Sequence, residues 1–150
     1  MRFDRSRLAV AALFGFASAA MMGLSGSARA ESPWPANARV YFIAPSNGEN
    51  VTGKVTVKFG LSGIGVAPAG VEKANTGHHH LLIDTDAPTG DKLSLPLPVD
   101  AHVRHFGGGQ TETVLELPPG RHTLQLIVGD ANHVPHDPPL ESDKIEIDVK

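Results

Sequence analysis

Hydrophobic and polar residues alternate in several short runs along the chain. The clearest run spans residues 121–128, where every second residue is apolar or histidine. Strict alternation places successive side chains on opposite faces of a β-strand. Similar runs predict further strands over residues 40–43, 51–59, 78–84, 111–117 and 144–149. Residues 100–106 predict a short strand or a turn. Helical periodicity is missing from residues 31–150, so the pattern predicts an all-β fold.

Clusters of proline and glycine separate these runs. Pro118-Pro119-Gly120 predicts a tight turn, while the glycine-rich stretch 60–77 and the proline-rich stretch 86–98 predict loops. Nearly all prolines fall between the predicted strands, as a sheet requires. About seven short strands joined by turns are typical of an immunoglobulin-like antiparallel β-sandwich. We predict this fold for residues 39–150, preceded by a proline-rich lead-in over 31–38.

The first thirty residues follow a different pattern. Three arginines precede an uncharged apolar run from Leu8 to Leu24, and Ala28-Arg29-Ala30 has the small-x-small form of a cleavage site. This pattern is typical of a secretory signal peptide, which we expect to be cleaved after Ala30. The predicted mature protein is periplasmic or secreted, and it contains no further apolar run that could span a membrane.

Composition narrows the classes of partner. Residues 1–30 contain four of the 13 basic and one of the 16 acidic residues, so 31–150 carry a net charge of −6 with neutral histidines. This negative charge argues against nucleic acid and anionic membranes as partners. The sequence has no cysteine, and all three methionines lie in the first thirty residues. A metal site in residues 31–150 would therefore use imidazole, carboxylate or backbone ligands, which suit Zn(II), Cu(II) or Ni(II).

Three of the eight histidines lie together in the segment 77–84, Gly-His-His-His-Leu-Leu-Ile-Asp. In a strand, His78 and His80 would share one face with Asp84, whereas His79 would face the opposite side. Two imidazoles on one face, roughly 6–7 Å apart at the backbone, are within reach of one metal ion. The same pattern also fits an exposed polar face. For His79 we predict a buried structural role.

Two further histidine pairs lie in predicted loops, at 102 and 105 and at 133 and 136. If the strands 78–84 and 121–128 are antiparallel neighbours, the second pair would lie at the same pole of the sandwich as His78 and His80. His102 and His105 could join them from the preceding loop. Three or four imidazoles there would form a tetrahedral or square-planar site. The predicted metal ligands are His78, His80, His105, His133 and His136, and the predicted outer groups are Asp84, Asp130 and Asn132.

Each outer group has an alternative role. Asp130 and Asn132 could instead be turn formers that bond to their own backbone. His122 opens the strand 121–128 on its apolar face, next to a turn. We predict that His122 is a packed histidine bonded to a backbone carbonyl, with metal ligation as the alternative.

Three motifs occur together in this sequence: GHHHLLID at 77–84, HFGGGQTE at 105–112 and GDANHVPH at 129–136. Together they resemble a bacterial family of exported domains of unknown function, some of which are mislabelled as rod shape-determining proteins. The resemblance covers about residues 38–150, and its most specific part is the Asn-His-x-Pro-His loop. It implies an exported β-sandwich with repeated use of these histidines, and it implies no activity.

Three functions are compatible with these observations. The first is an exported metal-binding module that handles Cu(II) or Zn(II) through clustered histidines. The second is a structural or interaction module of the cell envelope, with another envelope protein as its partner, whose histidines pack and respond to pH. The third is a small metalloenzyme. The sequence lacks His-Glu-x-x-His, Gly-x-Ser-x-Gly and any cysteine nucleophile, which favours the two non-enzymatic functions.

Overall fold

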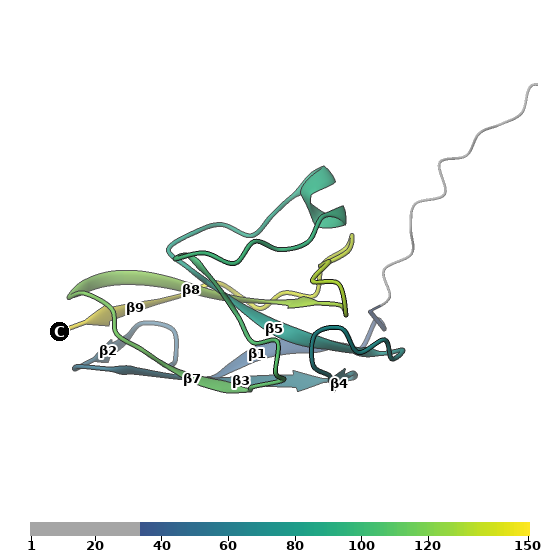
Figure 1. Cartoon of the computed structure of the whole chain (residues 1–150). Helices are drawn as coiled ribbons and strands as arrows, with labels where there is room; N and C mark the ends of the chain where they lie inside the picture. The colour runs from purple at the N-terminus through teal and green to yellow at the C-terminus, as the bar shows by residue number, and fades with distance from the viewer. Residues whose placement is uncertain (1–33) are drawn as a thin grey trace, which may run out of the picture.

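Two β-sheets pack face to face in the computed structural model, which describes residues 34–150 (Figure 1). The predicted signal peptide and the start of the lead-in lie outside the described residues. Among the residues that are described, no helix has the length and apolar character needed to cross a membrane.

The smaller sheet has three antiparallel strands, in the order β1 (Arg39–Ala44), β3 (Val55–Ser62) and β7 (Glu112–Leu115). The larger sheet follows the order β2 (Glu49–Val51), β9 (Ile145–Val149), β8 (Gly120–Gly129), β5 (Thr76–Ile83) and β4 (Gly65–Val66). Its sixth strand, β6 (Val103–His105), pairs with β5. The predicted all-β, immunoglobulin-like sandwich is therefore confirmed.

Two details differ from the prediction. The predicted strand 51–59 is two separate strands, because Gly53 adopts a left-handed φ of 78° that turns the chain between β2 and β3. β2 then pairs in parallel with β9 in the other sheet. The predicted loop 60–77 contains β4, which pairs in parallel with the start of β5. Alternation alone does not reveal where the chain passes from one sheet to the other, which here depends on the backbone conformation of Gly53.

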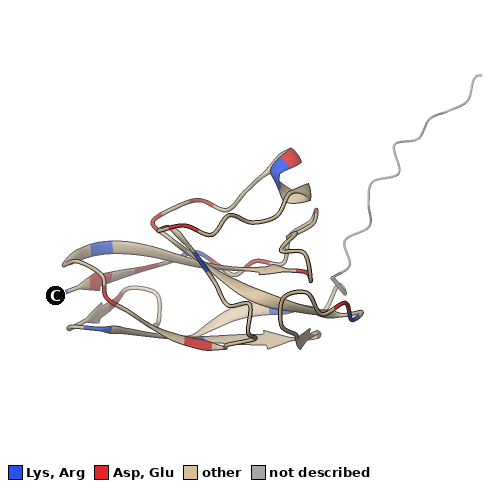
Figure 2. Ribbon diagram, in the orientation of Figure 1, with Lys and Arg blue, Asp and Glu red and all other residues tan. Residues whose placement is uncertain are grey.

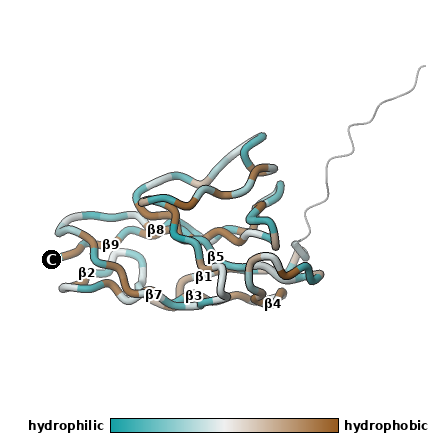
Figure 3. Tube along the Cα trace, in the orientation of Figure 1, coloured by the Kyte–Doolittle hydropathy of each residue, from teal (hydrophilic) through white to brown (hydrophobic). Residues whose placement is uncertain are grey.

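The main core fills the space between the two sheets. β3 contributes Val55, Val57 and Phe59, and the facing strands β5 and β8 contribute alternate apolar residues. Burying each such side chain stabilises the fold by about 1.5–3 kcal/mol. Hydrophobic and hydrophilic stretches alternate along the strands (Figure 3), and charged residues are dispersed over both layers (Figure 2).

A second apolar cluster lies on the outer side of the larger sheet. Leu82 of β5 and Ile127 of β8 pack there against Leu97 and Val103. The last two residues belong to the excursion between β5 and the end of β6, which includes the 3₁₀ turn η1 (Gly90–Ser94). Figure 1 shows this excursion above the larger sheet. Because the excursion covers the outer face, every residue of β5 from Gly77 to Ile83 is buried.

Candidate metal site

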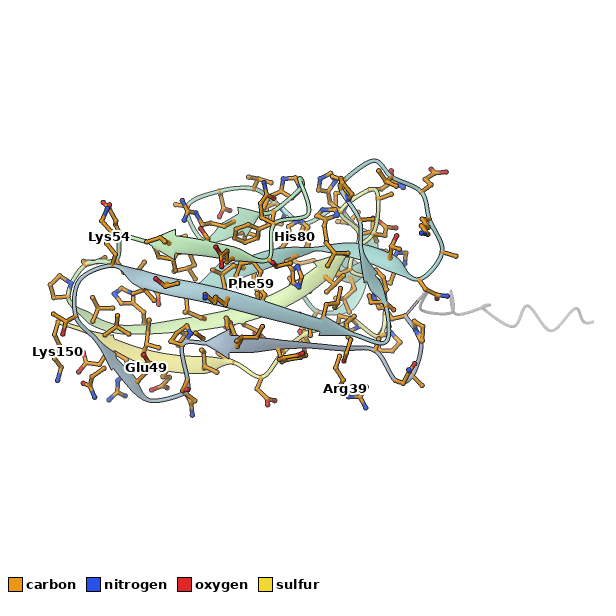
Figure 4. All side chains as sticks on the ribbon, turned by 90° about the horizontal axis from the view of Figure 1, so that it is seen from below. Arg39, Glu49, Lys54, Phe59, His80 and Lys150 are labelled. Carbon is orange, nitrogen blue, oxygen red and sulfur yellow. The ribbon has the colours of Figure 1, made fainter. Side chains whose placement is uncertain are left out.

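β5 places two histidines side by side on its covered outer face. His78 and His80 are separated by one residue, so their side chains leave the strand in the same direction. Both are fully buried, and their ring centroids lie 4.8 Å apart. Figure 4 labels His80 near the middle of the molecule. The prediction that these two imidazoles share a face is correct, and the alternative of an exposed polar face is wrong.

The third histidine, His105, comes from β6. The antiparallel register places His105 directly opposite His80, and side chains on paired positions of this kind lie next to each other. The His105 ring centroid is 5.0 Å from those of both His78 and His80. The chain then folds back over the ring at Gly107, where a Cβ atom would lie 2.2 Å from Cε1 of His105. The glycine run of the second motif thus makes room for this imidazole.

The fourth histidine, His133, follows β8. β5 and β8 are antiparallel neighbours, as hypothesised from the sequence, and Gly129 pairs with His78. The chain leaving β8 therefore turns next to the histidine face of β5. The His133 ring lies 5.0 Å from His78, 5.9 Å from His80 and 4.6 Å from His105, measured between centroids. We refer to His78, His80, His105 and His133 as the histidine cluster.

Five ring nitrogens of this cluster are buried without a hydrogen-bonding partner among residues 34–150. Within residues 34–150, neither ring nitrogen of His78 or His80 makes a hydrogen bond, and neither does Nε2 of His105. A buried polar group left unpaired costs about 1–3 kcal/mol, so native proteins rarely tolerate several together. One ligand nitrogen from each of His78, His80 and His105 lies within 4.8 Å of the other two. This triad could hold a metal ion.

The surroundings keep His78, His80 and His105 uncharged at neutral pH. Burial, followed by repulsion from His78, His105 and His133, lowers the pKa of His80 to about 3. The carbonyl of His78 opposes this shift slightly, although it lies outside hydrogen-bonding geometry.

Burial is also the main cause that lowers the pKa of His78 to about 4, with smaller contributions from His105 and His133. Asp130 acts in the opposite direction on His78. The pKa of His105 is lowered too, first by burial and then by His133. Neutral imidazoles retain the free lone pairs that metal coordination requires.

His136 points away from the cluster, although it was predicted as a ligand. Its Nε2 lies 2.8 Å from Oδ2 of Asp130, and its ring packs edge-on against Trp34 at 5.8 Å. Both His133 and His136 adopt a left-handed backbone, with φ of 68° and 65°. These two turns send the side chains of the pair in different directions, which an i, i+3 spacing in a loop cannot reveal.

The predicted outer groups also have other positions. Asp130 accepts hydrogen bonds from the backbone N–H groups of Asn132 and Val134, at 2.8 and 3.0 Å, which is the turn-forming alternative. The negative charge of Asp130 nevertheless lies close enough to His78 to oppose the lowering of the His78 pKa. The side chain of Asn132 is exposed. Asp130 therefore shapes the loop that carries His133 and adds negative charge near the cluster.

Asp84 lies at the opposite end of β5 from the cluster. Its φ of 54° ends the strand and turns its carboxylate towards His122, with Oδ2 2.7 Å from Nδ1. Nε2 of His122 donates to the carbonyl of Pro118 at 2.8 Å, so the predicted packed histidine is confirmed. Burial opposes protonation of His122, but Asp84 and then Pro118 outweigh it and raise its pKa.

The remaining two histidines are also separate from the cluster. His79 faces the main core and packs against Phe59 at 5.1 Å, in agreement with its predicted structural role. Burial lowers the pKa of His79 to about 4, against a smaller opposing effect of the Gly60 backbone. Nδ1 of His102 lies 3.0 Å from the carbonyl oxygen of Ile83.

Two solved structures show a limited similarity to this fold. One is an endo-beta-1,4-mannanase from Thermotoga petrophila, with 17% identity and a TM-score of 0.43 over 75% of this chain. This chain spans about a fifth of the mannanase, since the match covers 20% of it. The other comprises the CbhA fibronectin(III)-like modules from Clostridium thermocellum, with 15% identity and a TM-score of 0.36, covering 73% of this chain and 92% of that chain.

Among curated proteins, none matches this sequence significantly. A family model described as a domain of unknown function, DUF4399, matches residues 57–150. These residues include β5, β6 and the loop after β8, and hence the whole histidine cluster. The match agrees with the resemblance stated from the three motifs. By sequence, the chain belongs to the DUF4399 family.

Proposed function

We propose that this protein is an exported metal-binding module that holds one divalent transition metal ion, Zn(II) or Cu(II), in metal handling. The observation that carries the proposal is the group of buried, unpaired ring nitrogens on His78, His80 and His105. A metal ion accepts lone pairs from several of these nitrogens at once and so offsets the cost of burying them. Export rests on the pattern of residues 1–30.

The donor set fits such an ion. Imidazole is a preferred ligand of Zn(II) and Cu(II), and no thiolate or thioether is available in residues 31–150. Three protein ligands from two adjacent strands form a rigid base, since backbone pairing fixes His80 opposite His105. Sites built on paired strands hold their geometry better than sites on loops.

Calorimetric titration of residues 31–150, without a histidine tag, with Zn(II) and Cu(II) tests the proposal. We expect one ion per chain with sub-micromolar affinity at neutral pH. His105→Ala should weaken binding at least about tenfold. His102→Ala is the matched control because it removes an imidazole from the same segment, outside the cluster, and it should bind as the wild type does.

Weak heat spread over several sites, or equal affinity in His105→Ala and wild type, would contradict the proposal. The alternative function would then gain support. In that case the protein would be an envelope interaction module, and the buried imidazoles would serve as groups that protonate when the surroundings acidify.

A further inference from the structure

We infer that His133 is the fourth ligand of this site and that it closes a tetrahedral shell of four imidazoles, built for Zn(II) and not for Cu(II). The inference rests on the proposed function and goes beyond it, because it assigns a coordination geometry and an ion. It uses the positions of the four rings and of the loop that carries His133.

The distances between the four rings are those of a tetrahedron. With metal–nitrogen bonds of about 2.0–2.1 Å, each ring centroid lies about 3.2 Å from the ion, so tetrahedral centroids are about 5.2 Å apart. A square-planar arrangement would give four distances of about 4.5 Å and two of about 6.4 Å. The six observed distances run from 4.6 to 5.9 Å, and four of them are 4.8 or 5.0 Å.

Three hydrogen bonds hold the backbone of the His133 loop in place. The carbonyl of His133 accepts a hydrogen bond from the N–H of Leu97 at 2.9 Å, which ties the loop to the excursion above the sheet. Asp130 bonds to the N–H groups on either side of His133, at residues 132 and 134. A left-handed backbone at a non-glycine residue costs about 1 kcal/mol or more and persists only where its surroundings fix it.

Gly129 allows this loop to approach the cluster. A Cβ atom at position 129 would lie 2.9 Å from Cε1 of His80 and 3.1 Å from the backbone of His133. Gly129 does not have a left-handed φ, so it serves here to provide space. The third motif begins with this glycine, and its absence of a side chain lets His133 lie next to His80.

The remaining step is a rotation of the His133 side chain. The set of ligand nitrogens within 4.8 Å of one another comprises those of His78, His80 and His105. The His133 ring stands at 82° to His78, edge-on, and at 57° to His105. The inference requires that the partly buried His133 ring turn about its two side-chain bonds, so that one of its nitrogens is aimed at the centre of the cluster.

The geometry decides between the candidate ions. Zn(II) has no electronic preference that opposes a tetrahedron, whereas Cu(II) and Ni(II) favour square-planar or tetragonal sites. Cu(II) binds most nitrogen sites more tightly than Zn(II), so selectivity has to come from geometry. Four imidazoles held by three chain segments at near-equal distances oppose the flattening that Cu(II) requires.

Co(II), which reports coordination number through its visible absorption, tests this inference together with Zn(II) titration. Wild-type protein loaded with Co(II) should show the intense bands of a tetrahedral ion. His133→Gly keeps the left-handed backbone without strain. It should reduce the band intensity and weaken Zn(II) at least about tenfold. Free imidazole added to this variant should restore the bands.

His136→Gly is the matched control, because it removes the other left-handed histidine of the same loop, and it should leave both readouts unchanged. Weak five- or six-coordinate Co(II) bands in the wild type would overturn the inference. Unchanged Zn(II) affinity in His133→Gly would overturn it as well. Equal losses in the two glycine variants would do so too, since they would trace the effect to loop integrity. Failure of the wild type to bind either ion would instead refute the proposed function.

Discussion

The two faces of β5 carry histidines with opposite roles. On the inner face, His79 packs against Phe59 in the main core, with Leu81 and Ile83 beside it. On the outer face, His78 and His80 meet imidazoles from β6 and from the loop after β8. All three histidines of the strand are fully buried and have lowered pKa values. Burial and a shifted pKa therefore do not distinguish a site from a core position, whereas convergence of several chain segments does.

The largest expected difference between the two faces is in metal affinity. His80→Ala removes a ligand from the centre of the cluster and should weaken Zn(II) binding by about 100-fold or more. His79→Leu, on the inner face, should leave affinity within about threefold, because it replaces a packed ring by an apolar side chain of similar size. Calorimetric titration of both variants measures this difference. Equal losses in the two would show that the faces are not functionally distinct.

Acid should destabilise the metal-free protein through both faces together. The folded-state pKa values of His78 and His79 are about 4, and that of His80 is about 3, all below the ordinary 6.5. Below pH 6.5 the unfolded chain gains protons at these histidines that the folded chain does not gain. Their contribution to the free energy of unfolding is therefore fully present above pH 6.5 and is lost as the pH falls towards 4. For each such histidine, the free energy of unfolding falls by about 1.4 kcal/mol per pH unit across this range.

Urea unfolding of the metal-free protein between pH 7 and pH 4 measures this effect. His79→Leu should reduce the slope of stability against pH by about a third, because it removes one of three similar groups. His122 acts with the opposite sign, since its pKa is raised and its stabilising contribution is lost as pH rises. A stability that does not change from pH 6.5 to pH 4 would contradict the assignment of neutral, buried imidazoles.

A smaller loss of Zn(II) affinity is expected when Gly129, which lets the His133 loop approach β5, is replaced. Gly129→Ala should separate His80 from His133 by a few tenths of an ångström and weaken Zn(II) about tenfold. Gly65→Ala is the matched control, because a Cβ there meets its nearest atom at 3.4 Å, an ordinary contact. Equal affinity in both variants would show that the approach of the two rings is not needed for binding.

The sequence predicted the strands of the site better than its loops. Alternation identified β5 and β8, placed His78 and His80 on one face and assigned His79 to the core. Strand pairing could only be assumed from the sequence, although the assumption was correct for β5 and β8. The position of His105 opposite His80 depends on a register that alternation does not encode.

Backbone conformation explains why two of the predicted site residues, Asp84 and His136, lie away from the cluster. Asp84 would share the histidine face if β5 continued, but its left-handed φ ends the strand and turns it towards His122. His136 is separated from His133 by left-handed turns at both residues. A non-glycine residue gives little sequence signal for this conformation, because its cost is met by tertiary contacts.

Disulfide bonds strengthen many small domains, but this chain has no cysteine and cannot form them. In the inferred four-histidine site, a Zn(II) ion held by His78, His105 and His133 would join three distant points of the chain. It would close two successive loops of about 27 residues each, and a disulfide closing one such loop stabilises a fold by about 3–4 kcal/mol in the chain-entropy model. The histidine cluster would then act as a reversible staple, one that a chelator opens and that an oxidising or reducing environment leaves unchanged.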